Sequence, residues 1–151
     1  MSNSEVCEKA VFELCALDDL SCPPAEVTDN PVWPRVSESL ERIYEVGGFV
    51  ELRVSGGSQG FVKRLYMKAI PGKYRLVILT RSSDPKAELQ EWWESGSSKF
   101  RGVISIGDDE WDARTVCSDL SVAKVIFKEF FDSGDLSSGL RQMRSQWDPK
   151  P

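Results

Sequence analysis

Residues 107–136, GDDEWDARTVCSDLSVAKVIFKEFFDSGDL, contain an acidic turn, a strand pattern and a helix pattern in direct succession. From Trp111 to Cys117, apolar or small residues alternate with polar ones, which is the period of a half-buried strand. Ser118 or Asp119 can cap a following helix, and Gly134 can end it. The apolar residues of that helix recur at helical spacing: Val122, Ala123, Ile126, Phe127 and Phe130. The stretch therefore predicts a strand followed by a helix that docks on it.

Similar patterns upstream predict the remaining elements. They are a strand at 6–17, an irregular connection at 18–31, a helix from Pro34 to Gly47, strands at 49–54, 64–69 and 74–80, a helix at 84–94 and a strand at 100–106. This order indicates an α+β fold: a mostly antiparallel sheet of about six strands, with two or three helices packed on one face. We expect a single domain over residues 1–136 and a partly ordered C-terminal tail over residues 137–151.

The composition narrows the classes of function. The chain has 151 residues and no histidine, which removes the commonest general base and a frequent metal ligand. No CxxC pair is formed by the four cysteines, Cys7, Cys15, Cys22 and Cys117. We therefore expect reduced structural thiols, no metal, no cofactor and no enzymatic activity. Without a signal peptide or a long apolar run, the chain is expected to be cytoplasmic and not to contact a membrane.

Charge is segregated along the chain, although the formal net charge is only −5. Residues 52–83 contain no acidic residue and seven basic ones: Arg53, Lys63, Arg64, Lys68, Lys73, Arg75 and Arg81. Aromatic residues are interleaved with them, so a nucleic-acid-binding surface is one alternative. The acidic balance of the chain and the lack of an RNP motif argue against nucleic acid as a partner. An uncharacterised small α+β domain is the other alternative.

Three short motifs carry a family resemblance. They are Trp111-Asp112-Ala113-Arg114, the sequence Phe-Phe-Asp-Ser-Gly-Asp at 130–135, and Asn30-Pro31-Val32-Trp33 before the first helix. With these motifs the chain resembles the first-numbered immunity-protein family of bacterial polymorphic toxin systems and a related uncharacterised bacterial domain family. The resemblance implies a protein that binds a cognate toxin, most plausibly a nuclease used in competition between bacteria, and neutralises it by stoichiometric occlusion. It implies no cofactor.

A basic toxin would be attracted to an acidic surface, because complementary charge speeds encounter and rejects other partners. We therefore expect the acidic turn and the helix at 84–94 to face the toxin, with a tryptophan as a possible anchor. The candidate toxin-binding residues are Glu91, Trp92, Glu94, Asp108, Asp109, Glu110, Trp111 and Asp112. A metal site in the acidic turn is not favoured, because the spacing of a calcium loop is absent.

Overall fold

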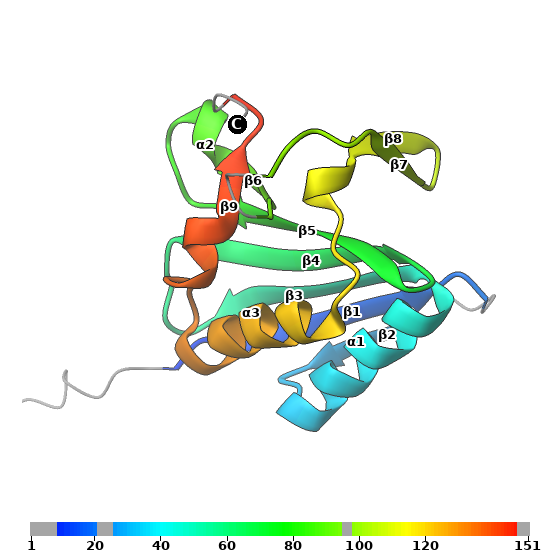
Figure 1. Ribbon diagram of the computed structural model, residues 1–151. Coiled ribbons are helices and arrows are strands. Elements are labelled where there is room, and N and C mark those ends of the chain that lie inside the picture. Colours follow the sequence, from blue (N-terminus) through cyan, green and yellow to red (C-terminus); the bar gives the residue numbers. More distant parts are fainter. Residues whose placement is uncertain (1–8, 21–25, 95–97, 148–151) are drawn as a thin grey trace, which may run out of the picture.

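The computed structural model describes residues 9–20, 26–94 and 98–147. A seven-stranded antiparallel sheet has the order β2-β1-β3-β4-β5-β6-β9, so the predicted α+β class is confirmed (Figure 1). Its strands are β1 (Val11–Asp18), β2 (Glu26–Asp29), β3 (Gly48–Gly56), β4 (Val62–Ile70), β5 (Lys73–Thr80), β6 (Leu89–Trp92) and β9 (Met143–Ser145). A separate hairpin is formed by β7 (Val103–Ile106) and β8 (Asp109–Asp112).

Two long helices, α1 (Trp33–Val46) and α3 (Leu120–Ser133), lie side by side on one face of the sheet (Figure 1). Both begin and end near the predicted positions. The Asp119 side chain accepts a hydrogen bond from the Ser121 N–H at 2.9 Å, and Gly134 adopts the left-handed conformation at φ 77° that closes α3. Pro34 occupies the first turn of α1, where a missing N–H costs no helical hydrogen bond.

Strands β3, β4 and β5 form the predicted meander, and their alternate residues build the core. Fully buried side chains from these strands include Leu52, Leu65, Met67 and Ile78. They pack against the apolar stripes of the two helices, which contribute Val36, Leu40, Ile43, Ala123, Ile126, Phe127 and Phe130. Most basic residues of these strands alternate with the core residues and therefore lie on the opposite face of the sheet.

Two segments differ from the sequence-based expectation in the N-terminal half and in the middle of the chain. The connection at 18–31, expected to be irregular, contains β2, which pairs with β1. The helix expected at 84–94 is wrong: only α2 (Pro85–Glu88) is helical, and Leu89–Trp92 is a strand. Because β6 pairs with both β5 and β9, its backbone is satisfied on two sides, and this pairing overrides the helical spacing of Leu89, Trp92 and Trp93.

The C-terminal part also departs from expectation. The strand expected to run to Cys117 stops at Asp112 and is followed by a 3₁₀ turn, η2 (Ala113–Thr115), and by a single bridge between Cys117 and Tyr74. Residues 137–145, expected to belong to a tail, contain the 3₁₀ turn η3 (Gly139–Gln142) and β9. Since β9 is an edge strand of the large sheet, the folded domain continues past residue 136. None of the helices in the described ranges is long and apolar enough to span a membrane.

Candidate functional site

The β7–β8 hairpin lies across the face of the sheet opposite the two long helices. Tyr74 points to the helices, since its hydroxyl accepts a hydrogen bond from the Ala123 N–H of α3 at 3.0 Å. Its neighbour Arg75 therefore points to the other face, where its guanidinium carbon lies 3.5 Å from the centre of the Trp111 ring on β8. In the hairpin register Trp111 is opposite Ile104. The hairpin thus rests on the sheet through an arginine–indole contact.

A buried ion pair supports this contact from the neighbouring strand. The Arg75 Nη2 lies 2.9 Å from Glu91 Oε1, with the two side chains only 7% and 14% exposed. Glu91 was expected to be part of an acidic binding rim. Its carboxylate instead forms an ion pair with Arg75. This pair compensates the guanidinium for the water that it loses on burial.

Two further arginines hold the base of the hairpin. The Arg114 Nε and Nη2 groups donate to both carboxylate oxygens of Asp112, at 3.0 and 2.8 Å, and the guanidinium lies 5.1 Å from the Trp93 ring centre. Arg101 makes the same two-pronged contact with Glu94, at 2.7 and 2.5 Å. The hydrogen bonds from Arg101 lower the pKa of Glu94, so this carboxylate stays ionised and paired in the folded protein.

The structure therefore divides the eight candidate residues into two groups. Five of them already have contacts within the domain: Glu91, Glu94 and Asp112 in ion pairs, Trp92 in the core at 7% exposure, and Trp111 on Arg75. The helix at 84–94, which was expected to share the toxin-facing surface with the hairpin, does not form beyond Glu88. Three acids remain on the exposed tip of the hairpin, and none of them forms an ion pair with another described residue: Asp108, Asp109 and Glu110.

Exposed apolar side chains occur at the other end of the hairpin, near its base. Val103 is 53% exposed and stands on β7 opposite Asp112, and Phe100 just before it is 62% exposed. Exposed apolar side chains and exposed carboxylates on one element are the ingredients of a protein-binding surface, which combines apolar contacts with a polar rim. Phe100 and Val103 were not among the predicted site residues, although both occur in a segment expected to be a strand. We call Phe100, Val103, Asp108, Asp109 and Glu110 the hairpin surface.

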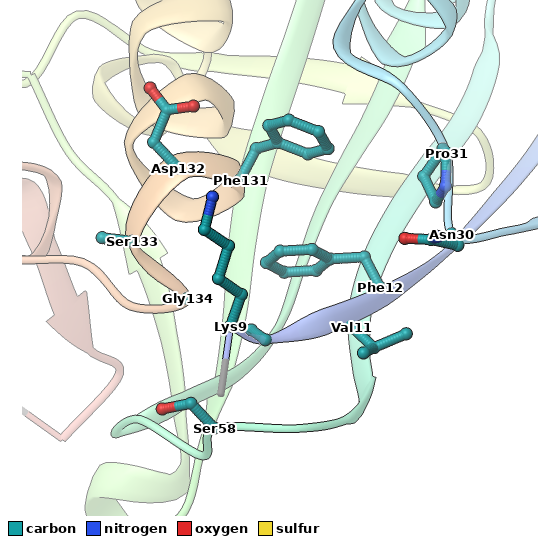
Figure 2. Close-up of a pocket in the computed structure, with 11 residues that line it drawn as sticks. Lys9, Val11, Phe12, Asn30, Pro31, Ser58, Phe131, Asp132, Ser133 and Gly134 are labelled. Atoms are coloured by element: carbon teal, nitrogen blue, oxygen red, sulfur yellow. The ribbon is translucent and has the colours of Figure 1, made fainter. Parts of the chain in front are cut away.

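Other regions offer less chemistry. A cavity of about 620 Å³ lies between the start of β1, Asn30–Pro31, Ser58 and the end of α3 (Figure 2). The stacked rings of Phe12 and Phe131, 5.7 Å apart, line it, while Asp132 forms an ion pair with Lys128 on its own helix. Across the parts of the chain with described positions, no group of three or more acidic or cysteine side chains is arranged to hold a metal ion.

The cysteines and the buried tyrosine have structural surroundings. Cys15 is half-buried and Cys117 buried, both as free thiols, while Cys7 and Cys22 lie outside the described residues. Burial, reinforced by the nearby carboxylates of Glu51 and Glu13, raises the pKa of the Cys15 thiol. Burial also raises the pKa of Tyr74, whose hydroxyl donates to the Asp119 carbonyl at 2.6 Å. Neither group is therefore prepared to act as a nucleophile.

Comparison with known proteins identifies relatives but no activity. The chain is similar over 87% of its length to the crystal structure of a hypothetical protein from Neisseria gonorrhoeae, with a TM-score of 0.64 and 14% sequence identity, covering 94% of that chain. This likeness shows a shared fold. No curated protein matches the chain. Residues 22–140 match the model of the family of unknown function DUF6911, and the chain belongs to that family.

Proposed function

We propose that this DUF6911 protein is a non-catalytic binding protein of the bacterial cytoplasm that neutralises a basic toxin by covering its working surface. The observation that carries the proposal is the hairpin surface: its tip has three exposed carboxylates that form no ion pair with another described residue, and two exposed apolar side chains lie near its base. The resemblance of the segment around Trp111–Asp135 to bacterial immunity proteins suggests the type of partner. It favours a nuclease toxin, whose nucleic-acid-binding surface would be positively charged.

The anchoring of the hairpin supports this function physically. A loop that must become ordered on binding loses conformational entropy, which weakens the complex. Here the base of the hairpin is held by the contact of Arg75 with Trp111 and by the two-pronged ion pair of Arg114 with Asp112. The tip carboxylates are thereby presented in a defined position before any partner arrives. Such preorganisation suits an inhibitor that must bind tightly and quickly.

The alternative of a nucleic-acid-binding module on residues 52–83 is less well supported by the charge distribution. Arg53 is paired with Glu13, Arg64 with Glu51 at 3.5 Å, and Arg75 is buried with Glu91. These cross-strand pairs interrupt the continuous positive track that a nucleic-acid backbone requires. A protein partner for the hairpin surface is therefore the preferred function.

The proposal is tested by measuring affinity for toxin domains encoded beside the gene, using calorimetry with the full-length protein. We expect the Asp108→Lys, Asp109→Lys double variant to bind about 100-fold more weakly, because both reversals place like charges against the toxin. A Glu38→Lys, Glu45→Lys double variant has the same change in net charge on exposed positions of α1 and serves as the control. Equal affinities of the two variants would remove the hairpin surface from the interface, and binding to none of the toxins would overturn the function.

A further inference from the structure

A β-bulge in β4 places two adjacent basic residues on the same face of the sheet. Val62 pairs with Thr80 and Arg64 pairs with Leu79, so Lys63 is the extra residue with no partner on β5. Val62 and Leu65 are both fully buried, which leaves Lys63 and Arg64 together on the side away from the core. In a regular strand, alternation would have turned one of two neighbouring residues into the core. Bulges of this kind re-aim side chains near functional sites.

Basic residues from neighbouring strands converge on the same place. Arg53 on β3 is directly opposite Arg64 on β4, and Arg81 immediately follows β5. A hollow of about 340 Å³ opens between them, and its lining consists of Arg53, Val54, Ser55, Lys63, Arg64 and Arg81. We call it the basic hollow. Four of its six lining residues are cations, and none is acidic.

The acids around the basic hollow neutralise only part of this charge. Arg53 forms an ion pair with Glu13, and Arg64 lies 3.5 Å from Glu51. Among the described residues, Lys63 and Arg81 form no ion pair. The Arg81 Nε donates to the Gly60 carbonyl at 2.9 Å, which fixes the guanidinium while leaving its terminal N–H groups available. Two positive charges of the hollow thus have no counter-charge in the described part of the chain.

We propose that the basic hollow binds the phosphoryl group of a small anionic ligand. Guanidinium groups match the geometry of phosphate oxygens through paired hydrogen bonds, and Lys63 adds a point charge beside them. The small volume of the hollow, about 340 Å³, and the ion pairs of Arg53 and Arg64 favour a small anion over an extended polyanion. The site uses side-chain donors and not the glycine-rich turn at 55–60, which connects two strands and lacks the helix of a phosphate-binding loop.

This site is separate from the hairpin surface, because Arg75 under the hairpin is near the start of β5 and Arg81 is just past its end. The test is calorimetric titration of the full-length protein with inorganic phosphate, pyrophosphate and a single-stranded oligonucleotide at low ionic strength. The variant is Lys63→Gln. The matched control is Lys68→Gln, which removes another half-buried lysine of β4 that has no ion pair among the described residues and lies outside the hollow.

We expect saturable binding of phosphate or pyrophosphate that weakens about tenfold in Lys63→Gln, the loss typical of one charge-assisted hydrogen bond, and stays unchanged in Lys68→Gln. Saturable binding of phosphate but not of pyrophosphate would indicate a site for free phosphate. Tighter binding of pyrophosphate than of phosphate would indicate a site for phosphorylated metabolites. Absence of saturable binding, or equal weakening in both variants, would overturn the proposal. Binding of only the oligonucleotide would also overturn it and indicate an extended surface. Retained phosphate binding by the Asp108→Lys, Asp109→Lys variant would separate this site from the hairpin surface.

Discussion

The Arg75 guanidinium contacts both the Trp111 ring and the Glu91 carboxylate. Its central carbon lies 3.5 Å from the centre of the ring, and its Nη2 lies 2.9 Å from Glu91 Oε1. Its Nε is buried and has no hydrogen-bond partner among the described residues. The indole face therefore covers a cation that has lost much of its water, where a cation–π contact is strongest. This arrangement connects β5, β6 and the hairpin, and it explains why Glu91, predicted to lie on an exposed acidic rim, is instead held in a buried ion pair.

Glu91→Gln is expected to lower the free energy of unfolding by about 3 kcal/mol, because it leaves the Arg75 charge buried and unpaired. Urea denaturation followed by circular dichroism measures the change. Glu110→Gln is the matched control, since Glu110 is exposed on the hairpin tip, and its effect should stay within about 0.5 kcal/mol. Equal stabilities of the two variants would show that the pair contributes nothing to the fold.

Trp111→Leu is expected to loosen the hairpin more than the rest of the domain. Loss of the ring removes its contact with Arg75, and we expect faster hydrogen exchange at residues 103–112 and a decrease of about 1–2 kcal/mol in unfolding free energy. Trp147→Leu, which removes a ring that is 62% exposed, should leave the exchange of the hairpin unchanged. Unchanged exchange in Trp111→Leu would contradict the proposed anchoring.

Gly60→Ala is expected to destabilise the domain by about 1–3 kcal/mol through overcrowding. A Cβ at Gly60 would lie 2.6 Å from Asp135 Cγ, and Asp135 cannot move easily because its carboxylate accepts hydrogen bonds from the Phe61 and Val62 N–H groups, both at 2.9 Å. At Gly56 an added Cβ would meet only Val11 at 3.8 Å, so Gly56→Ala is the control. Thermal unfolding of both variants compares the two positions, and equal melting temperatures would argue against the crowding.

Glu129 is expected to contribute to acid sensitivity. Although burial raises its pKa, hydrogen bonds from the Gly139 N–H, the Ser137 hydroxyl and the Ser138 N–H lower the pKa overall. A lowered folded-state pKa gives stability that is present above the ordinary glutamate pKa, about 4.3, and is lost as the pH falls through the folded value. Glu129→Gln should therefore be less stable than the native protein at pH 7.

The same variant should lose less stability on acidification than the native protein, because it no longer has this carboxylate to protonate. Urea denaturation between about pH 3 and 7 measures both slopes. Glu45→Gln, at an exposed position on α1, should follow the native curve. Parallel curves for Glu129→Gln and the native protein would show that Glu129 is not linked to folding.

The candidate site illustrates what sequence patterns can locate. The acidic turn at Asp108–Glu110 was recognised from residue types alone, because turn residues and their exposure are local properties. The ion pairs of Glu91, Glu94 and Asp112 were not, since an acidic residue in a sequence does not indicate which arginine will approach it. The basic hollow could not be predicted for a related reason. The adjacent residues Lys63 and Arg64 lie on the same face of the sheet only because β4 forms a bulge where it pairs with β5.

Elements whose signals are local could be predicted from the residues of each segment. Capping by Asp119, termination at Gly134 and the alternating strands of the meander depend on backbone geometry and apolar periodicity within a few residues. Tertiary structure alone decided that Leu89–Trp92 is a strand, that β9 joins the sheet, and which carboxylates stay free. These outcomes depend on hydrogen-bond and charge partners that are distant in the chain, and the free energy of those contacts exceeds the small local preferences of the residues involved.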